Sequence, residues 1–228
     1  MRHCSRRYNL QLPRAFAKDH GKMNFEPYLT TDTNATIELI TNVVAEDAAS
    51  APMVDANGLS LLLEAATDLS FRKAREEIHV NENTIVRQDF ELCYDIPSDG
   101  AFWYYATAME CHLNKALAQM SSPPLVPSLH LNDLVLQRYA AGSQGITPHR
   151  DHVRYQSLVV LLVLSGHGRY YICSDREGNG AREIPAPAGH VILMRAPGFA
   201  NRKDRPFHFL SDITSERYSF GIRYDAMA

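Results

Sequence analysis

The sequence predicts an α+β fold in which a double-stranded β-helix, or jelly roll, forms the core and N-terminal helices pack on one face. Two observations lead to this prediction. Residues 128–228 contain eight short segments with strand-like character, separated by turn residues, and that number of strands suits a jelly roll of two sheets. Residues 23–127 instead carry three segments with helical character.

The predicted helices span residues 33–45, 58–78 and 98–120. In the second, leucine and alanine recur near helical spacing, and Asp55 and Asn57 ahead of it offer N-cap side chains. The third ends before Ser121-Ser122-Pro123-Pro124, the clearest boundary in the chain. Between the second and third helices, residues 84–96 alternate apolar and polar side chains and predict one strand.

The core strands are predicted from turn residues between alternating segments. Gly166-His167-Gly168 and Asn179-Gly180 are typical of hairpin connections. We therefore expect three parts: a basic, flexible N-terminal extension (1–22), a mainly helical part with one or more strands (23–127), and the jelly-roll catalytic core (128–228). The expected core strands are 129–140, 146–152, 157–165, 169–174, 181–184, 191–196, 205–211 and 217–225.

Three side chains on two of these strands are candidate metal ligands. His149 and Asp151 lie two residues apart, so in a strand they project to the same face; His208 lies on a later strand. Two imidazoles and one carboxylate are the ligand set that holds non-haem Fe(II) while leaving coordination positions open. A His-x-Asp motif alone is weak, since about half of one is expected by chance in a chain with ten histidines. His208, between two phenylalanines, could also be a core residue.

The last strand adds a second signal. Arg217, Ser219, Gly221 and Arg223 share one face, while aromatic and aliphatic residues occupy the other. If the arginine face points into a barrel, its charges are buried and need an anion. A dicarboxylate matches, because the guanidinium fork binds carboxylate oxygens in pairs. The alternative is an exposed edge strand with ordinary surface arginines.

Together with Gln137-Arg138-Tyr139, these motifs resemble the 2-oxoglutarate and Fe(II)-dependent oxygenases over roughly residues 131–224. Within that superfamily the chain looks most similar to the AlkB-like branch, whose pattern is Asn-x-Tyr, His-x-Asp, His, and Arg-x-Asn-x-Thr-x-Arg. It departs from that pattern at Gln137, Ser219 and Gly221. The short spacing from His208 to Arg217 is nearer that of the small-molecule hydroxylases.

The resemblance implies Fe(II), 2-oxoglutarate and O2 as cofactor and co-substrates. Fe(II) would be held by His149, Asp151 and His208. The 2-oxoglutarate would be bound by Arg217, with Ser219, Tyr139 and Gln137 assisting. Arg223 would either bind the other end of the co-substrate or pair structurally; Tyr139 could equally be a core aromatic.

The implied function is a dioxygenase that oxidises, and most simply hydroxylates, a small-molecule or amino-acid-like substrate, releasing succinate and CO2. Three alternatives stay open. The first is an AlkB-like oxidative demethylase of nucleic acid or protein. The second is a cupin-like metalloenzyme that does not use 2-oxoglutarate. The third is a non-catalytic jelly-roll binding module.

Charge is distributed in a way that does not favour nucleic acid as the substrate. Residues 23–127 carry 16 acidic and five basic side chains, whereas residues 1–22 carry six basic and one acidic. Proteins that bind a duplex normally show a continuous basic surface. The basic N-terminal segment can be read as a solvated tail, as an extension upstream of a start at Met23, or as an organelle transit segment.

Other features predict a cytoplasmic protein without a membrane span. The longest apolar run, 158–164, is strand-sized, and no secretory segment is recognised. The four cysteines form no CxxC pair, so free thiols in a reducing compartment are expected.

Phe102-Trp103-Tyr104-Tyr105 could line a substrate pocket but fits a helix core better. The loop of Arg195, Arg202, Lys203 and Arg205 could meet substrate or be a solvated turn. His152, His167 and His190 lack the strand phase of ligands.

Overall fold

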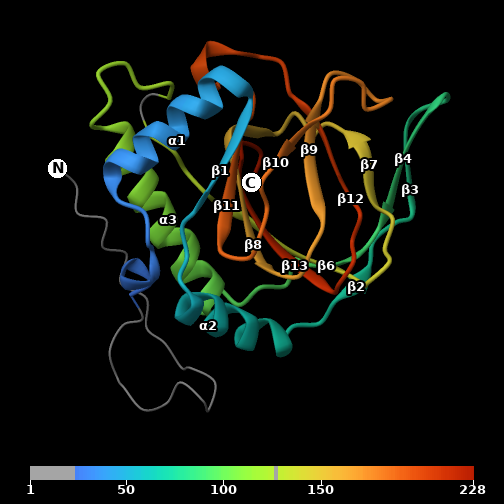
Figure 1. Cartoon of the computed structure of the whole chain (residues 1–228), viewed down its shortest axis with the longest axis horizontal. Coiled ribbons are helices and arrows are strands. Elements are labelled where there is room, and N and C mark those ends of the chain that lie inside the picture. Colours follow the sequence, from blue (N-terminus) through green and yellow to red (C-terminus); the bar gives the residue numbers. More distant parts are fainter. Residues whose placement is uncertain (1–23, 126–127) are drawn as a thin grey trace.

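Two antiparallel sheets face each other with helices on one side, as the sequence predicts (Figure 1). This computed structural model describes residues 24–125 and 128–228. The predicted N-terminal extension therefore lies outside the described residues, and the three-part division of the chain stays a prediction.

The larger sheet has seven strands and the smaller has six, all paired antiparallel. The larger follows the order β1 (Ala48–Pro52), β11 (His190–Arg195), β8 (Tyr155–Ser165), β13 (Arg217–Asp225), β6 (Asp133–Tyr139), β5 (Glu91–Cys93) and β2 (Arg72–Lys73). The smaller follows the order β10 (Arg182–Ile184), β9 (Arg169–Cys173), β12 (Phe207–Ser211), β7 (Gly145–His149), β4 (Thr84–Asp89) and β3 (Glu77–Asn81). Strands from before residue 94 thus complete both sheets beside the predicted core strands.

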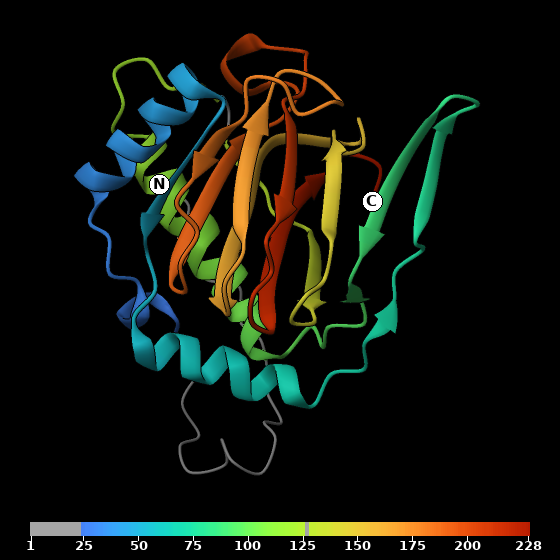
Figure 2. The same ribbon diagram turned by 45° about the vertical axis from the view of Figure 1, so that its right-hand side comes forward.

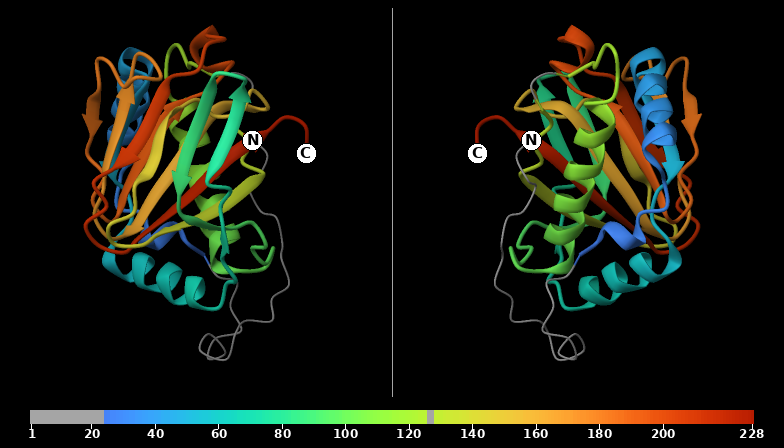
Figure 3. Two further views of the ribbon diagram at one scale, coloured as in Figure 1. Left: turned by 90° about the vertical axis from the view of Figure 1, so that its right-hand side faces the viewer. Right: turned by 90° about the vertical axis from the view of Figure 1, so that its left-hand side faces the viewer.

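Three helices, α1 (Thr33–Glu46), α2 (Ala56–Thr67) and α3 (Ala101–Leu117), pack along the larger sheet (Figure 3). Asp32 and Asp55 are N-caps, because their carboxylates accept from the backbone N–H of Ala35 and Gly58. Short 3-10 turns occur at Glu26–Tyr28 and Phe199–Asn201. The apolar faces of the helices meet the outward side chains of the larger sheet in one buried cluster.

The alternation predicted for the last strand is observed. Phe220 and Ile222 point outward into the helix-side cluster, where the ring of Phe220 lies 4.8 Å from that of Phe102. Phe102 and Tyr105 are both buried there, so these aromatic residues of α3 belong to the core and do not line the site described below. The inward residues of β13 are left facing the space between the two sheets, where a second buried cluster includes Tyr139, Ile192 and Leu210.

The prediction of one long helix at 58–78 is wrong in its second half. The helix ends at Thr67, and the chain then forms β2 and β3. Arg72 and Lys73 pair with Leu92 and Glu91, and β3 pairs with β4. These pairings between separate segments override a local preference for helix, which is only a weak guide.

The single strand predicted at 84–96 is two strands in different sheets. β4 pairs with β7 in the smaller sheet, whereas β5 pairs with β6 in the larger. The chain crosses between the sheets at Phe90, which is buried in the cluster between them. The β3–β4 hairpin stands at one edge of the molecule, away from the helices (Figure 2).

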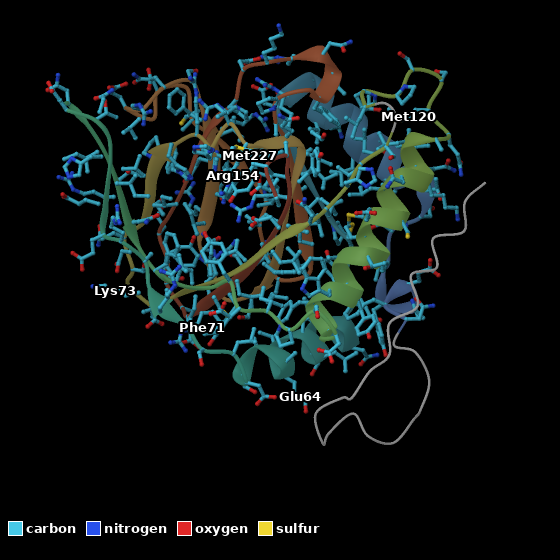
Figure 4. All side chains as sticks on the ribbon, turned by 180° about the vertical axis from the view of Figure 1, so that it is seen from behind. Glu64, Phe71, Lys73, Met120, Arg154 and Met227 are labelled. Carbon is cyan, nitrogen blue, oxygen red and sulfur yellow. The ribbon has the colours of Figure 1, made fainter. Side chains whose placement is uncertain are left out.

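The C-terminal end of β13 returns to the start of β8. Figure 4 shows the labelled Arg154 and Met227 close together at this point. The backbone N–H of Ala226 donates to the carbonyl oxygen of Arg154 at 3.0 Å, and Arg154 Nε forms an ion pair with Asp225 at 3.2 Å. These contacts extend the pairing of β13 with β8 beyond the last residues of the ladder, Asp225 and Tyr155.

Cys93 and Cys173 are buried free thiols, as expected, but Cys111 is not a free thiol, and Cys4 lies outside the described residues. None of the helices in the described ranges is both long and apolar enough to cross a bilayer.

We predict that Gly166→Ala destabilises the fold by about 3 kcal/mol or more. Gly166 follows β8 with φ +77°, and an added Cβ would lie 2.0 Å from the carbonyl oxygen of Glu216. Gly142 is the control, since it has φ +82° but no atom within 4 Å of the same Cβ position; Gly142→Ala should cost only about 1 kcal/mol. Urea unfolding of both variants measures the difference, and equal losses would contradict the close approach at Gly166.

Candidate metal centre

The pairing of β7 with β12 places two of the predicted ligands directly opposite each other. His149 is the register partner of His208, and their ring centroids lie 4.2 Å apart. The donor atoms of His149, Asp151 and His208 all lie within 4.8 Å of one another. The structure therefore brings the three predicted ligands together, although β7 ends at His149, so Asp151 lies just beyond the strand.

Asp151 faces His208 without bonding to it. The distance from Asp151 Oδ1 to His208 Nε2 is 3.8 Å, which is too long for a hydrogen bond. The backbone carbonyl of Asp151 accepts a hydrogen bond from Arg205 Nη1. The main chain beyond β7 is thus tied to the segment that leads into β12.

The protonation states suit a metal site. Burial, together with the nearby charge of His208, lowers the pKa of His149 to about 3, and burial lowers the pKa of His208. His149 Nδ1 lies 3.0 Å from the carbonyl oxygen of Thr147. Because a carbonyl oxygen only accepts, Nδ1 carries the proton and the lone pair of Nε2 is available to a metal.

Asp151 is ionised in this setting. Burial opposes ionisation, but electrostatic interactions with the two histidines, Arg223 and Arg205 lower the pKa of Asp151 below its ordinary value. The guanidiniums of Arg223 and Arg205 are the permanent charges among them, because both imidazoles are neutral at neutral pH. A carboxylate beside two neutral imidazoles is the donor set of an open, facial iron site. The residues present therefore fit Fe(II).

A cavity between the two sheets connects these three side chains with four of the other predicted site residues, but Arg217 is not among its lining residues. Its lining includes Gln137, Tyr139, Ser219 and Arg223, with aliphatic side chains from both sheets. Tyr139 is buried, and burial raises its pKa while the charge of Arg217 acts in the opposite direction. Ser219 is 1% exposed, and its Oγ has no hydrogen-bond partner.

Arg217 is a fully buried cation with unused donors. Its exposed fraction is 0%, and it lies opposite Tyr139 in the pairing of β13 with β6. Nη1 donates to the carbonyl oxygen of Ala186 at 3.2 Å, but Nε and Nη2 have no partner among the residues that the structure describes. Burial lowers the pKa of Arg217 to about 10, so it stays protonated at neutral pH. A buried guanidinium with two unpaired N–H donors raises the free energy of the folded state unless an anion binds beside it.

Arg223 pairs structurally, which is one of the two roles that the sequence left open, and binding of the co-substrate stays a prediction. Its Nη2 forms an ion pair with Asp133 Oδ2 at 2.8 Å that lacks hydrogen-bond geometry. Its guanidinium lies 4.2 Å from the ring centroid of Tyr155, and its side chain also lines the cavity. Structural pairing is therefore observed, while Nε remains without a partner on the cavity side of the sheet.

Sequence reasoning missed Tyr170, whose ring stacks on His208 with centroids 5.8 Å apart. The sequence did carry a signal for Tyr170, because Tyr170 and Ile172 lie two residues apart on one strand and both side chains point into the space between the sheets. Arg205 was named only as part of a loop. Arg195 is the last residue of β11, is 1% exposed and pairs with Asp47 and Asp204, so its role is structural. Within the described residues, His152, His167 and His190 join no group of metal donors.

No protein-family model and no curated protein matches the sequence. Three solved structures are similar over most of the chain. A prolyl hydroxylase from Trichoplax adhaerens, in complex with a hypoxia inducible factor oxygen degradation domain peptide fragment, has a TM-score of 0.62 at 10% identity, covering 86% of this chain and 90% of that one. A 2OG-Fe(II) oxygenase family oxidoreductase from Burkholderia pseudomallei has 0.58 at 12%, covering 84% and 90%. A Pseudomonas putida prolyl-4-hydroxylase has 0.57 at 15%, covering 83% and 98%.

At such identities the similarity shows the fold, which is the jelly roll of these oxygenases. The narrower resemblance to the AlkB-like branch stays a prediction.

We predict that the metal-free protein loses stability as the pH falls from about 6.5 toward about 3. The unfolded chain takes up a proton on His149 near pH 6.5, whereas the folded chain does so only near pH 3. Between these values the unfolded state binds more protons, so acid favours unfolding. Replacing His149 by Gln should reduce the slope of unfolding free energy against pH by up to about 1.4 kcal/mol per pH unit.

Urea unfolding of metal-free protein between pH 7 and pH 4.5 measures this slope. His79→Gln, at an exposed position of β3, is the control and should keep the wild-type slope. An unchanged slope in His149→Gln would mean that the folded protein already carries the proton.

Proposed function

We propose that the protein is an Fe(II)- and 2-oxoglutarate-dependent dioxygenase that hydroxylates a small-molecule or amino-acid-like substrate. One observation carries this proposal. A cluster of two imidazoles and a carboxylate shares a buried cavity with Ser219, two residues along β13 from a buried arginine whose Nε and Nη2 have no partner. A metal and a dicarboxylate together would satisfy both groups.

Each residue has a defined part in the proposal. His149, Asp151 and His208 would hold Fe(II). The Arg217 guanidinium would bind the far carboxylate of 2-oxoglutarate, with the Ser219 hydroxyl donating to the same group and Tyr139 and Gln137 lining its path. Burial of these side chains between the sheets keeps water away from the charged contacts, which strengthens them.

When bound, Fe(II) with 2-oxoglutarate and O2 supplies the oxidising power. With both bound, the reaction would place one oxygen atom of O2 in a substrate C–H bond as a hydroxyl and the other in succinate, with CO2 as the second co-product. The chain itself orients the co-substrate and holds Asp151 ionised through the positive charges around it.

An amino-acid-like substrate is supported by the prolyl hydroxylases among the similar structures, one of which is described in complex with a peptide fragment. The alternatives from the sequence are an AlkB-like demethylase, a cupin-like metalloenzyme and a binding module, and the titrations below distinguish the last two from the proposal. A cytoplasmic location, where Fe(II) stays reduced, is part of the proposal.

The first test is an anaerobic titration of metal-free protein with Fe(II) and 2-oxoglutarate, followed by visible absorption. The chelated pair gives a weak charge-transfer band, which should require both components. Asp151→Ala should weaken Fe(II) binding by about 100-fold or more, because it removes the only charged ligand. Glu82→Ala, at the exposed turn of the β3–β4 hairpin, is the control. Iron binding without a band would favour the cupin-like alternative, and no iron binding would leave a binding module.

The second test concerns Arg217. Arg217→Gln should weaken 2-oxoglutarate binding by about 100-fold or more, since a buried carboxylate would lose its charged partner, while Fe(II) binding is retained. Arg87→Gln, on the exposed hairpin, should bind 2-oxoglutarate like the wild type. Equal affinities for the Arg217 variant and the wild type would place the co-substrate elsewhere.

A further inference from the structure

Two arginines lie over the ring of Phe207 and a third lines the same cavity as that ring, and no ion pair neutralises any of them in the part of the chain that the structure describes. The guanidinium of Arg150 lies 3.9 Å from the Phe207 ring centroid, and that of Arg176 lies 5.3 Å from it. Arg205 lines the same cavity as Arg150 and Phe207. We call Arg150, Arg176 and Arg205 the arginine cluster.

The other arginines nearby differ from the cluster in being paired. Arg182 contacts Glu46 at 3.6 Å. Arg195 and Arg202 share Asp47 and Asp204, and all four side chains line the same polar cavity as Arg150 and Arg205. The acidic groups of this cavity are thus already engaged, and the unpaired positive charge is concentrated at the arginine cluster.

The arginine cluster adjoins the metal ligands along the backbone, while Arg150 and Arg205 line a separate cavity from the one that the ligands line. Arg150 stands between His149 and Asp151 in the chain, and Phe207 directly precedes His208. Arg205 donates a hydrogen bond to the carbonyl oxygen of Asp151. Arg150 is therefore the chain neighbour of two proposed ligands, His149 and Asp151. Phe207 is the chain neighbour of the third, His208.

Guanidiniums held together without a counter-ion repel one another, and an anion between them removes that cost. The Phe207 ring limits the positions of Arg150 and Arg176, so fewer side-chain conformations are lost when an anion binds. We propose that the arginine cluster binds a carboxylate or phosphate group of the substrate and so orients the carbon to be oxidised at the metal centre. The identity of the ligand as substrate rests on the proposed function; the anion site itself does not.

A single compact anionic group fits better than a nucleic-acid backbone. Binding a chain of phosphates requires a continued row of unpaired cations, whereas the cationic surface here stops at ion-paired Arg182, Arg195 and Arg202. Glu46, Asp47 and Asp204 would repel further phosphates on that side. The substrate we infer is therefore an acid, either a free small molecule or an acidic residue of a peptide.

Anion binding is tested first without turnover, using metal-free protein and inorganic phosphate in a calorimetric titration. The double variant Arg150→Gln/Arg176→Gln should bind phosphate about tenfold or more weakly than the wild type. Arg150→Lys/Arg176→Lys should retain part of the affinity, which separates lost charge from misfolding. The control Arg72→Gln/Arg75→Gln removes two exposed arginines that also lack ion pairs, and it should bind like the wild type. No binding by the wild type, or equal binding by the Gln double variant, overturns the proposal.

The source of the anionic group is tested by succinate release from matched pairs of compounds. Free carboxylic acids and Asp- or Glu-containing peptides are each compared with their amides. The acid should exceed its amide in kcat/KM by about tenfold or more, and Arg150→Gln/Arg176→Gln should abolish that preference. The arm that shows the preference, free acid or peptide, identifies the source. Turnover of a methylated single-stranded oligonucleotide that depends on the same arginines, with no acid preference, would overturn the proposal in favour of nucleic acid.

The two proposals fail in distinguishable ways. If the Fe(II) and 2-oxoglutarate band forms but phosphate binding is insensitive to Arg150 and Arg176, the anion site is wrong and the dioxygenase stands. If phosphate binding depends on these arginines but no band forms, the dioxygenase is wrong and the anion site stands.

Discussion

The antiparallel register of β7 against β12 is the constraint on which the candidate site depends. It sets His149 opposite His208, and a slip of one residue would turn one imidazole to the outer face of the sheet. The backbone beside this pair is adapted to that register. Gly145 has φ +73°, and a Cβ there would lie 1.9 Å from the carbonyl oxygen of Leu210, so the approach of the two strands requires glycine at this position.

The two faces of the larger sheet differ because the helices cover only one of them. The helices cover the outer face of the larger sheet, so the apolar residues of β13 can face them while Arg217 and Ser219 face the smaller sheet. The Arg217 guanidinium is then buried between two apolar layers, where pairing with a counter-ion stabilises it most. The same strand thus contributes both to the core and to the site.

Strand periodicity explains why much of the site could be predicted from the sequence. The faces of His149 and Asp151, and of Arg217 and Ser219, follow from alternation alone once the strands are recognised. The end of the second helix, the split at Phe90 and the arginine cluster could not be predicted. They depend on which distant segments meet, as when Arg150 and Arg176 converge on the ring of Phe207. Local propensity carries no information about such meetings.

The unpaired guanidinium of Arg217 has a consequence for the amount of folded protein. A ligand that binds only the native state stabilises it by mass action, and at 100 times its Kd it adds about 2.7 kcal/mol. An anion that fills the idle donors of Arg217 would act in this way. The lifetime of the chain in a cell would then rise and fall with the supply of that anion, so metabolism would control the abundance of the protein as well as its saturation.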